Sequence, residues 1–137
     1  MRSEPLTRSD DRERGSAVVD FVLVSVLVLT LLMAVLQVAV YVHVRNVVTA
    51  SAQQGARYAA AADVPSGDAA ARTVGIVGRA TSAQTAAGLR CAAGEEPDPS
   101  GMTLVVVRCT GSVPSLFAAL GSLLPVQATG RAIKEGA

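Results

Sequence analysis

Few side chains in this sequence could take part in chemistry. His43 is the only histidine, and it stands close to Tyr41 at the end of an apolar run, a place that suits a membrane-interface residue better than a catalyst. A catalytic nucleophile needs a base within hydrogen-bond reach, and a zinc site needs several nitrogen or sulfur ligands. The sequence contains neither arrangement, nor a pair of carboxylates placed for acid–base catalysis. We therefore expect no enzyme activity, no metal ion, no cofactor and no small-molecule substrate.

Asp20 is the charged residue in the most unusual place. It lies five positions after Gly15, at the start of a long apolar run, and a polar leader that contains arginines precedes it. An ionisable side chain within a membrane helix costs about 3 kcal/mol on insertion scales and is a functional candidate for that reason. The alternative is that Asp20 lies at the level of the lipid headgroups and is simply hydrated.

Residues 21–42 have the length and composition of a membrane-spanning helix. Only Ser25, Thr30 and Gln37 in this run are not hydrophobic. A helix needs about 20 apolar residues to cross the hydrocarbon of a bilayer. Valine is frequent here and favours strands in water, but an isolated strand in lipid would leave its backbone groups unpaired. We therefore predict one spanning helix in a single-pass protein of the cell membrane.

The charges that flank the span predict its orientation. Four arginines precede the span and two follow it within a comparable distance: Arg2, Arg8, Arg12 and Arg14, then Arg45 and Arg57. Positive residues stay on the cytoplasmic side, so we expect a cytoplasmic N-terminus and an extracytoplasmic C-terminal part. The alternative is a secretory signal cleaved at Ala50-Ser51-Ala52. Signal cores have about 7–15 apolar residues, so this run is too long, and that site lies well past its end.

The junction before the span resembles the signal of type IV pilins. It reads Arg12-Glu-Arg-Gly15-Ser16-Ala-Val-Val-Asp20-Phe21. In that family a prepilin peptidase cleaves after the glycine on the cytoplasmic side, and an acidic residue is fifth in the mature chain. The resemblance implies cleavage between Gly15 and Ser16, and a role for Asp20 in helix registry during assembly. The family usually has Glu at the fifth position and often Phe at the first, where this chain has Asp20 and Ser16.

Residues 12–62 as a whole are similar to the TadE family, the minor pseudopilins of tight-adherence (Flp) pilus systems. The more distinctive half follows the span and includes Gln-Gln-Gly55-Ala-Arg57. The resemblance implies a pilus assembly protein whose partners are the membrane, a prepilin peptidase, and other pilins or pseudopilins of the same system. The residues alone leave a second hypothesis, a single-pass membrane-anchored extracellular binding module. Such an anchor would have no use for the leader glycine or for a carboxylate at the start of its span.

The helix is predicted to continue beyond the membrane. The first strong stop is Asp63-Val-Pro65-Ser-Gly67, so the helix covers residues 16–62. At 1.5 Å per residue it would be about 70 Å long, against about 30 Å for the hydrocarbon core. Three alanines, Ala52, Ala56 and Ala60, form a stripe of small residues at i, i+4 and i+8. Such a helix-packing stripe lets another backbone come close, and either the chain's own domain or a partner could dock there.

Residues 63–137 predict a small extracytoplasmic α+β domain, after a leader of residues 1–15 and the helix of residues 16–62. Ser66 is placed to cap a second helix that runs to about Ala87, with Asp68 and Arg72 as a favourable i, i+4 pair. The domain is then predicted to continue with an antiparallel sheet of about three strands and one short helix.

The strands of this sheet are indicated by alternation and by turn residues. Residues 89–92 and 102–109 flank the turn-rich segment 94–101 and predict a hairpin with a long loop. Residues 112–121 predict the short helix, because Pro114 lies near its start and a glycine ends it. Residues 126–132 alternate between apolar and polar and predict the final strand.

Cys91 and Cys109 are the only two cysteines, and both fall in the predicted hairpin. With the domain outside the membrane, where disulfides persist, we expect them to be bonded. Along the second strand the face of Thr103, Val105 and Val107 continues to Cys109, so this thiol should point with them. Two buried free thiols, or a bond between two chains, are the alternatives.

The composition argues against nucleic acid as a partner. Twelve Lys and Arg residues stand against eleven Asp and Glu residues, so no basic excess is available for phosphates. The chain has two Phe, two Tyr and no Trp, too few to build a base-stacking surface.

Overall fold

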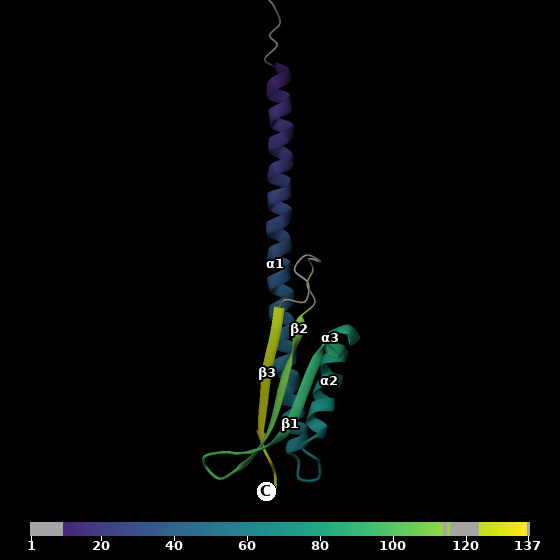
Figure 1. The fold of residues 1–137 in the computed structure, drawn as a ribbon, viewed down its shortest axis with the longest axis vertical. Coiled ribbons are helices and arrows are strands. Elements are labelled where there is room, and N and C mark those ends of the chain that lie inside the picture. Colours follow the sequence, from purple (N-terminus) through teal and green to yellow (C-terminus); the bar gives the residue numbers. More distant parts are fainter. Residues whose placement is uncertain (1–9, 114, 116–123, 137) are drawn as a thin grey trace, which may run out of the picture. The chain divides into compact units, whose positions relative to one another are not determined.

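The computed structural model describes residues 10–113, 115 and 124–136. The chain divides into two compact units, Met1–Leu36 and Gln37–Ala137, and each is considered by itself. Helix α1, Asp10–Ala60, contributes its first part to one unit and its last part to the other (Figure 1).

The first part of α1 exposes almost all of its side chains. Most of its large hydrophobic residues are about half to three-quarters exposed, for example Phe21 at 73% and Val35 at 65%. By length and composition α1 is the one candidate membrane span among the described residues, over Arg14–Ala60, with a mean hydropathy of 2.8 in its most apolar window. Such a helix would be unfavourable in water, because nothing in its own unit covers the apolar side chains. The finding agrees with a single-pass membrane protein.

The predicted second helix is two helices. They are α2, Asp68–Ala80, and α3, Ala83–Ala87, so the prediction of one helix to about Ala87 is wrong. The chain leaves the helix at Thr81, whose hydroxyl donates to the Val77 carbonyl at 2.7 Å. Ser82 then caps α3, because its side chain accepts from the Thr85 amide at 3.1 Å. Short polar side chains that bond the local backbone thus end one helix and begin the next.

The predicted cap and ion pair of this helix are also wrong. Gly67 occupies the N-cap position of α2, with no side-chain cap, and the Ser66 hydroxyl donates instead to the Glu95 carboxylate. The described residues contain no ion pair between Asp68 and Arg72. The Arg72 guanidinium lies over the Tyr58 ring, 5.0 Å from its centroid. An aromatic face on the neighbouring helix thus replaces the expected carboxylate.

Three antiparallel strands form the sheet, in the order β1-β2-β3. They are β1, Leu89–Pro97, β2, Thr103–Val113, and β3, Leu124–Ile133. The predicted fold class is therefore confirmed: an α+β chain with a long N-terminal helix, further helices and a three-stranded antiparallel sheet.

The hairpin loop is much shorter than predicted. The segment 94–97 belongs to β1, which pairs with β2 as far as Pro97 opposite Thr103. The turn closes when the Asp98 amide donates to the Met102 carbonyl at 2.7 Å. Gly101 has φ +84°, a conformation that glycine adopts without steric cost. The turn-forming residues of segment 94–97 therefore do not end the pairing between β1 and β2. An edge strand such as β1 tolerates a glycine and a terminal proline.

The predicted short helix begins in the wrong place. Ser112 and Val113 are the last residues of β2, opposite Pro125 and Leu124, and Ser115 is not helical. The rest of the predicted segment, residues 114 and 116–121, lies outside the described residues.

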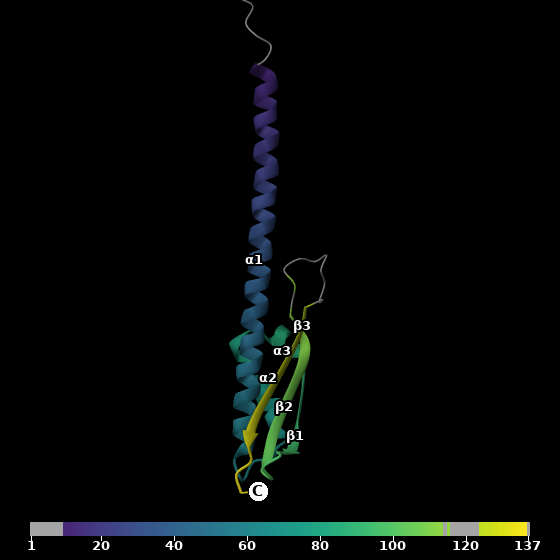
Figure 2. The ribbon, with the colours of Figure 1, turned by 90° about the vertical axis from the view of Figure 1, so that its left-hand side faces the viewer.

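The core of the second unit lies between the sheet and α1, whose last part runs beside the strands in both views (Figures 1 and 2). Buried residues of β3 alternate with exposed ones, as expected for a sheet with one solvated face, whereas Val105, Val106 and Val107 in the centre of β2 are all buried. The main members of the core from these elements are Val44, Val48, Ala52, Ala56, Val105, Val107, Cys109, Val126 and Ala128.

Candidate functional site

The predicted cleavage junction lies in an exposed part of α1. Gly15 and Ser16 are both exposed, and a Cβ added to Gly15 would meet nothing within 4 Å. A glycine inside a helix weakens it by about 1 kcal/mol relative to alanine. The helix therefore opens more readily here than in the alanine- and valine-rich turns that follow.

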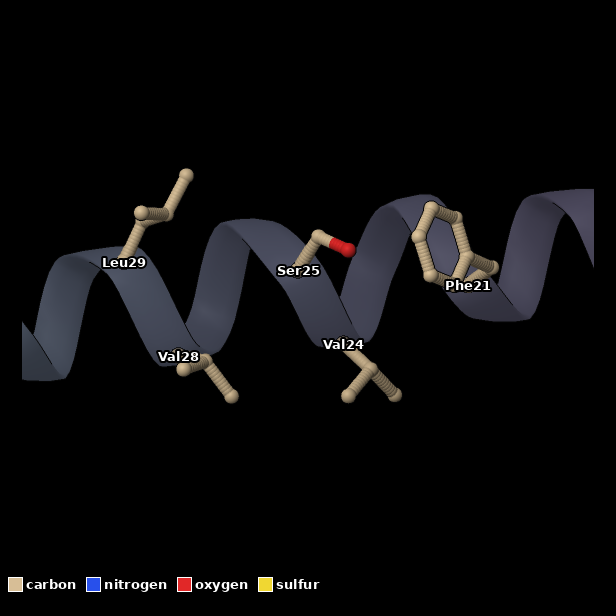
Figure 3. Close-up of a pocket in the computed structure, with 5 residues that line it drawn as sticks. All are labelled: Phe21, Val24, Ser25, Val28 and Leu29. Atoms are coloured by element: carbon tan, nitrogen blue, oxygen red, sulfur yellow. The ribbon is translucent and has the colours of Figure 1, made fainter.

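Asp20 is exposed and lies on the same helical row as Ser16, Val24 and Val28, which are four residues apart. Val24 and Val28 belong to a shallow apolar surface of α1 that we call the Phe21 face: Phe21, Val24, Ser25, Val28 and Leu29. Figure 3 shows these five side chains standing out from a single helix, in two adjacent rows. Rows at i, i+4 are the ridges with which helices pack against one another. Asp20 therefore extends one ridge of the Phe21 face toward the N-terminus.

The stripe of small residues lies in the core. Ala52 and Ala56 are completely buried, and Ala60 is 6% exposed. Of the two partners that the sequence left open, the chain's own domain occupies this stripe. The close approach is visible at Gly130 of β3, where an added Cβ would lie within 3.0 Å of the carbonyl group of Ala52.

Gln53 joins the open edge of β3 to α1. Its side-chain nitrogen donates to the Arg131 carbonyl at 3.0 Å, and its side-chain oxygen accepts from the Arg131 amide at 2.9 Å. The primary amide thus makes the same two bonds that a neighbouring strand would make. Nearer the start of β3, the Tyr41 hydroxyl donates to the Pro125 carbonyl at 3.1 Å. Tyr41, which the sequence analysis expected at the membrane interface, holds β3 against α1 through this hydrogen bond.

Lys134 closes the C-terminal end of α1. Its ammonium group donates to the carbonyls of Ala59 at 2.8 Å, Ala61 at 3.2 Å and Val64 at 2.6 Å. The last carbonyls of a helix lack partners within it and carry partial negative charge, so a cation is favourable there. Since Lys134 comes directly after β3, this contact fixes the end of the sheet to the end of the helix.

The disulfide between Cys91 and Cys109 is present. The two residues are direct partners in the β1–β2 ladder, and their Cα atoms are 4.1 Å apart. Cys109 is 1% exposed and lies in the core with Val105 and Val107, as the alternation of β2 predicted. The bond therefore ties the edge strand to the centre of the sheet.

The solvated face of the sheet carries the one ion pair among the described residues. Arg108 donates to the Glu96 carboxylate at 2.5 Å. This hydrogen bond lowers the pKa of Glu96 below its ordinary value and raises the pKa of Arg108. In the turn, hydrogen bonds from the side chain and backbone of Ser100 lower the pKa of Asp98.

The described residues include no group of three or more His, Cys, Asp or Glu side chains that could hold a metal ion. His43 is exposed on α1. The features of the chain that remain as candidates are therefore the junction, the Phe21 face with Asp20, and the folded domain.

Sequence reasoning missed Gln53, Lys134 and Gly130. The segment Gln-Gln-Gly-Ala-Arg contains a polar residue beside the alanine stripe, and Lys134 follows the last strand directly. Neither Gln53 nor Lys134 carries a local signal for its partner, because the partners are about 70 to 78 residues away in the sequence.

Comparison with protein families matched one model, that of TadE-like protein, over residues 15–57. Comparison with curated proteins and with solved structures gave no match. The matched segment begins at Gly15, contains Asp20 and the Phe21 face, and ends at Arg57 beside the buried alanines. It therefore covers the span and the beginning of the domain-packed part of α1. Residues 15–57 of this chain are thus a TadE-like segment, consistent with a TadE-like protein of the tight-adherence system.

Proposed function

We propose that this chain is a minor pseudopilin, a pilus assembly protein of a tight-adherence pilus. The TadE-like match suggests a protein associated with that pilus, from a structural rather than an enzymatic family. In the proposal a prepilin peptidase removes residues 1–15 on the cytoplasmic side, and the mature chain acts by packing its helix against other pilins.

The observation that carries this proposal is the combination of Asp20 with the Phe21 face. An anchor that only faces lipid would need an apolar surface but no carboxylate at the end of one of its ridges. A carboxylate in or near hydrocarbon is costly alone and tolerable when it is paired. After cleavage the α-ammonium of Ser16 would be the nearest cation along the row, in its own helix or in a neighbouring one.

Pairing between helices would set the depth at which two helices align. A partner helix packed on the Phe21 face would reach Asp20 at the N-terminal end of the ridge. An unpaired charge there would destabilise the helix pair by more than a paired charge would stabilise it. Asp20 therefore contributes more to the alignment of the two helices along their axes than to the strength of their association. The extracytoplasmic position of the domain rests on the arginines that precede the span and on the disulfide in the domain.

The first test is co-expression with a matching prepilin peptidase. We expect intact-mass analysis and N-terminal sequencing of the membrane-extracted protein to show a chain that begins at Ser16. A full-length chain, or one that begins at Gln53, would contradict the proposed processing.

The second test separates assembly from anchoring. Asp20→Asn should leave processing, membrane insertion and the disulfide unchanged, but it should reduce crosslinking to pilin partners and the amount of pili. Asp20→Glu, which keeps the carboxylate, is the matched control and should retain both. Normal crosslinking and piliation in the Asn variant would favour the alternative, a membrane-anchored binding module.

A further inference from the structure

The solvated face of the sheet carries three arginines on one diagonal. Side chains of directly paired residues lie on the same face of a sheet, so the register places Arg90, Arg108 and Arg131 together on the face opposite the core. Arg90 is opposite Thr110, Arg108 is two residues along from Thr110, and Arg131 is opposite Val106. Each step crosses one strand and advances two residues.

Strand geometry gives the spacing of this arginine row. Strands are about 4.8 Å apart and rise about 3.4 Å per residue, so each step is about 8 Å and the row spans about 17 Å. All three arginines are exposed. Val106 lies on the same face yet is only 2% exposed, with Arg108 and Arg131 as neighbours. The register thus places Arg108 and Arg131 on two sides of this valine, while both arginine side chains remain exposed.

The residues on one side of the row, toward β3, are polar and uncharged, whereas Ala92, Gly94 and Val106 lie on the other side. Thr110, Gln127 and Thr129 are exposed on the same face, beside the arginines. Glu96 is the only acidic residue of this face in the three strands, and it pairs with Arg108, which keeps further donors free. No aromatic side chain occurs in β1, β2 or β3.

We propose that this face binds a linear acidic polysaccharide. Guanidinium groups bind carboxylates with two parallel hydrogen bonds, and three of them in a straight row fit an extended chain better than a compact ligand. The hydroxyl and amide groups beside the row match the hydroxyl groups of sugar rings. Nucleic acid fits less well, because single strands are held by aromatic side chains on which bases stack, and the strands have none. The proposal goes beyond pilus assembly and uses the proposed extracytoplasmic position of the domain only to give access to such a polymer.

The test is binding of the full-length protein, in detergent or nanodiscs, to immobilised polygalacturonate. We expect binding that weakens as salt is raised, because the interaction is between exposed charges. The triple substitution Arg90→Gln, Arg108→Gln, Arg131→Gln should weaken binding at least tenfold. The matched control removes three exposed arginines from the helices, Arg45→Gln, Arg57→Gln and Arg79→Gln, and should bind within twofold of the wild type.

A gain of binding separates recognition from damage to the fold. Glu96→Gln removes the acidic residue from this face and should strengthen binding, which a structural defect would not do. Uncharged dextran should not bind, and single-stranded DNA should bind more weakly than polygalacturonate. Equal loss in the helix control, unchanged binding in the triple variant, weaker binding of Glu96→Gln, or equal or tighter binding of DNA or dextran would overturn the proposal.

Discussion

Gly130→Ala tests whether the packing of β3 on α1 holds the domain together. An added Cβ would lie within 3.0 Å of the Ala52 carbonyl group and 2.5 Å from the Gln53 amide nitrogen. These atoms belong to the backbone of a helix, so the strand must move away. Overpacking of this kind costs about 1–3 kcal/mol. The movement also disturbs the two hydrogen bonds between Gln53 and Arg131, each worth about 1 kcal/mol.

We therefore expect the free energy of unfolding to fall by about 3 kcal/mol, which for a domain of this size lowers the melting temperature by roughly 12 °C or more. Pulse proteolysis of the full-length protein across a urea series measures the loss. Gly94→Ala is the matched control, because its Cβ would meet nothing within 4 Å. Adding Ala52→Gly should not restore stability, since the obstruction is backbone. Equal stability of the Gly130 and Gly94 variants, or rescue by Ala52→Gly, would refute this account.

Three further predictions concern contacts of the domain. Lys134→Met should lower the free energy of unfolding by about 2 kcal/mol, because the carbonyl of Ala59 in the last turn of α1 and those of Ala61 and Val64 just after it lose a charged donor. Hydrogen exchange should quicken in the last turn of α1, and an unchanged exchange rate there would contradict the cap. Replacing Cys91 and Cys109 with alanine should cost about 3 kcal/mol, since the bond closes a loop over a sequence separation of 18; non-reduced peptide mapping of native protein checks the bond, and free thiols would count against it. The pKa of Glu96 is lowered by the Arg108 hydrogen bond, so the stabilising ion pair is fully present above the ordinary carboxyl pKa and is lost as the pH falls through the lowered pKa. NMR titration should show the pKa of Glu96 rising toward its ordinary value in Arg108→Gln. An unchanged pKa of Glu96 in that variant would exclude the ion pair in solution.

Local features of the chain were predictable from the sequence. The candidate span follows from a long run of mostly apolar residues without a charged side chain, and the hairpin and final strand follow from alternation with a period of two and from turn residues. The pairing of Cys91 with Cys109 was also accessible, because a chain with two cysteines in one hairpin offers one intramolecular bond. The proposed cleavage junction and Asp20 were singled out from the sequence because Gly15 ends a polar leader and a carboxylate stands at the start of the apolar run, and the family match covers both positions.

The tertiary structure decided the features that need a distant partner. The alanine stripe predicted close packing but not its occupant, which is the chain's own domain and its glycine at position 130. The length of β1 also differs from the prediction, because pairing with β2 continues to Pro97 and outweighs the local turn propensity. The break between α2 and α3 needs no distant partner, since the hydroxyls of Thr81 and Ser82 bond the nearby backbone. Gln53 and Lys134 carry no pattern in the sequence around them. Their roles exist only once the C-terminal strand is folded back against α1, since a hydrogen bond depends on which groups meet in space and not on their order along the chain.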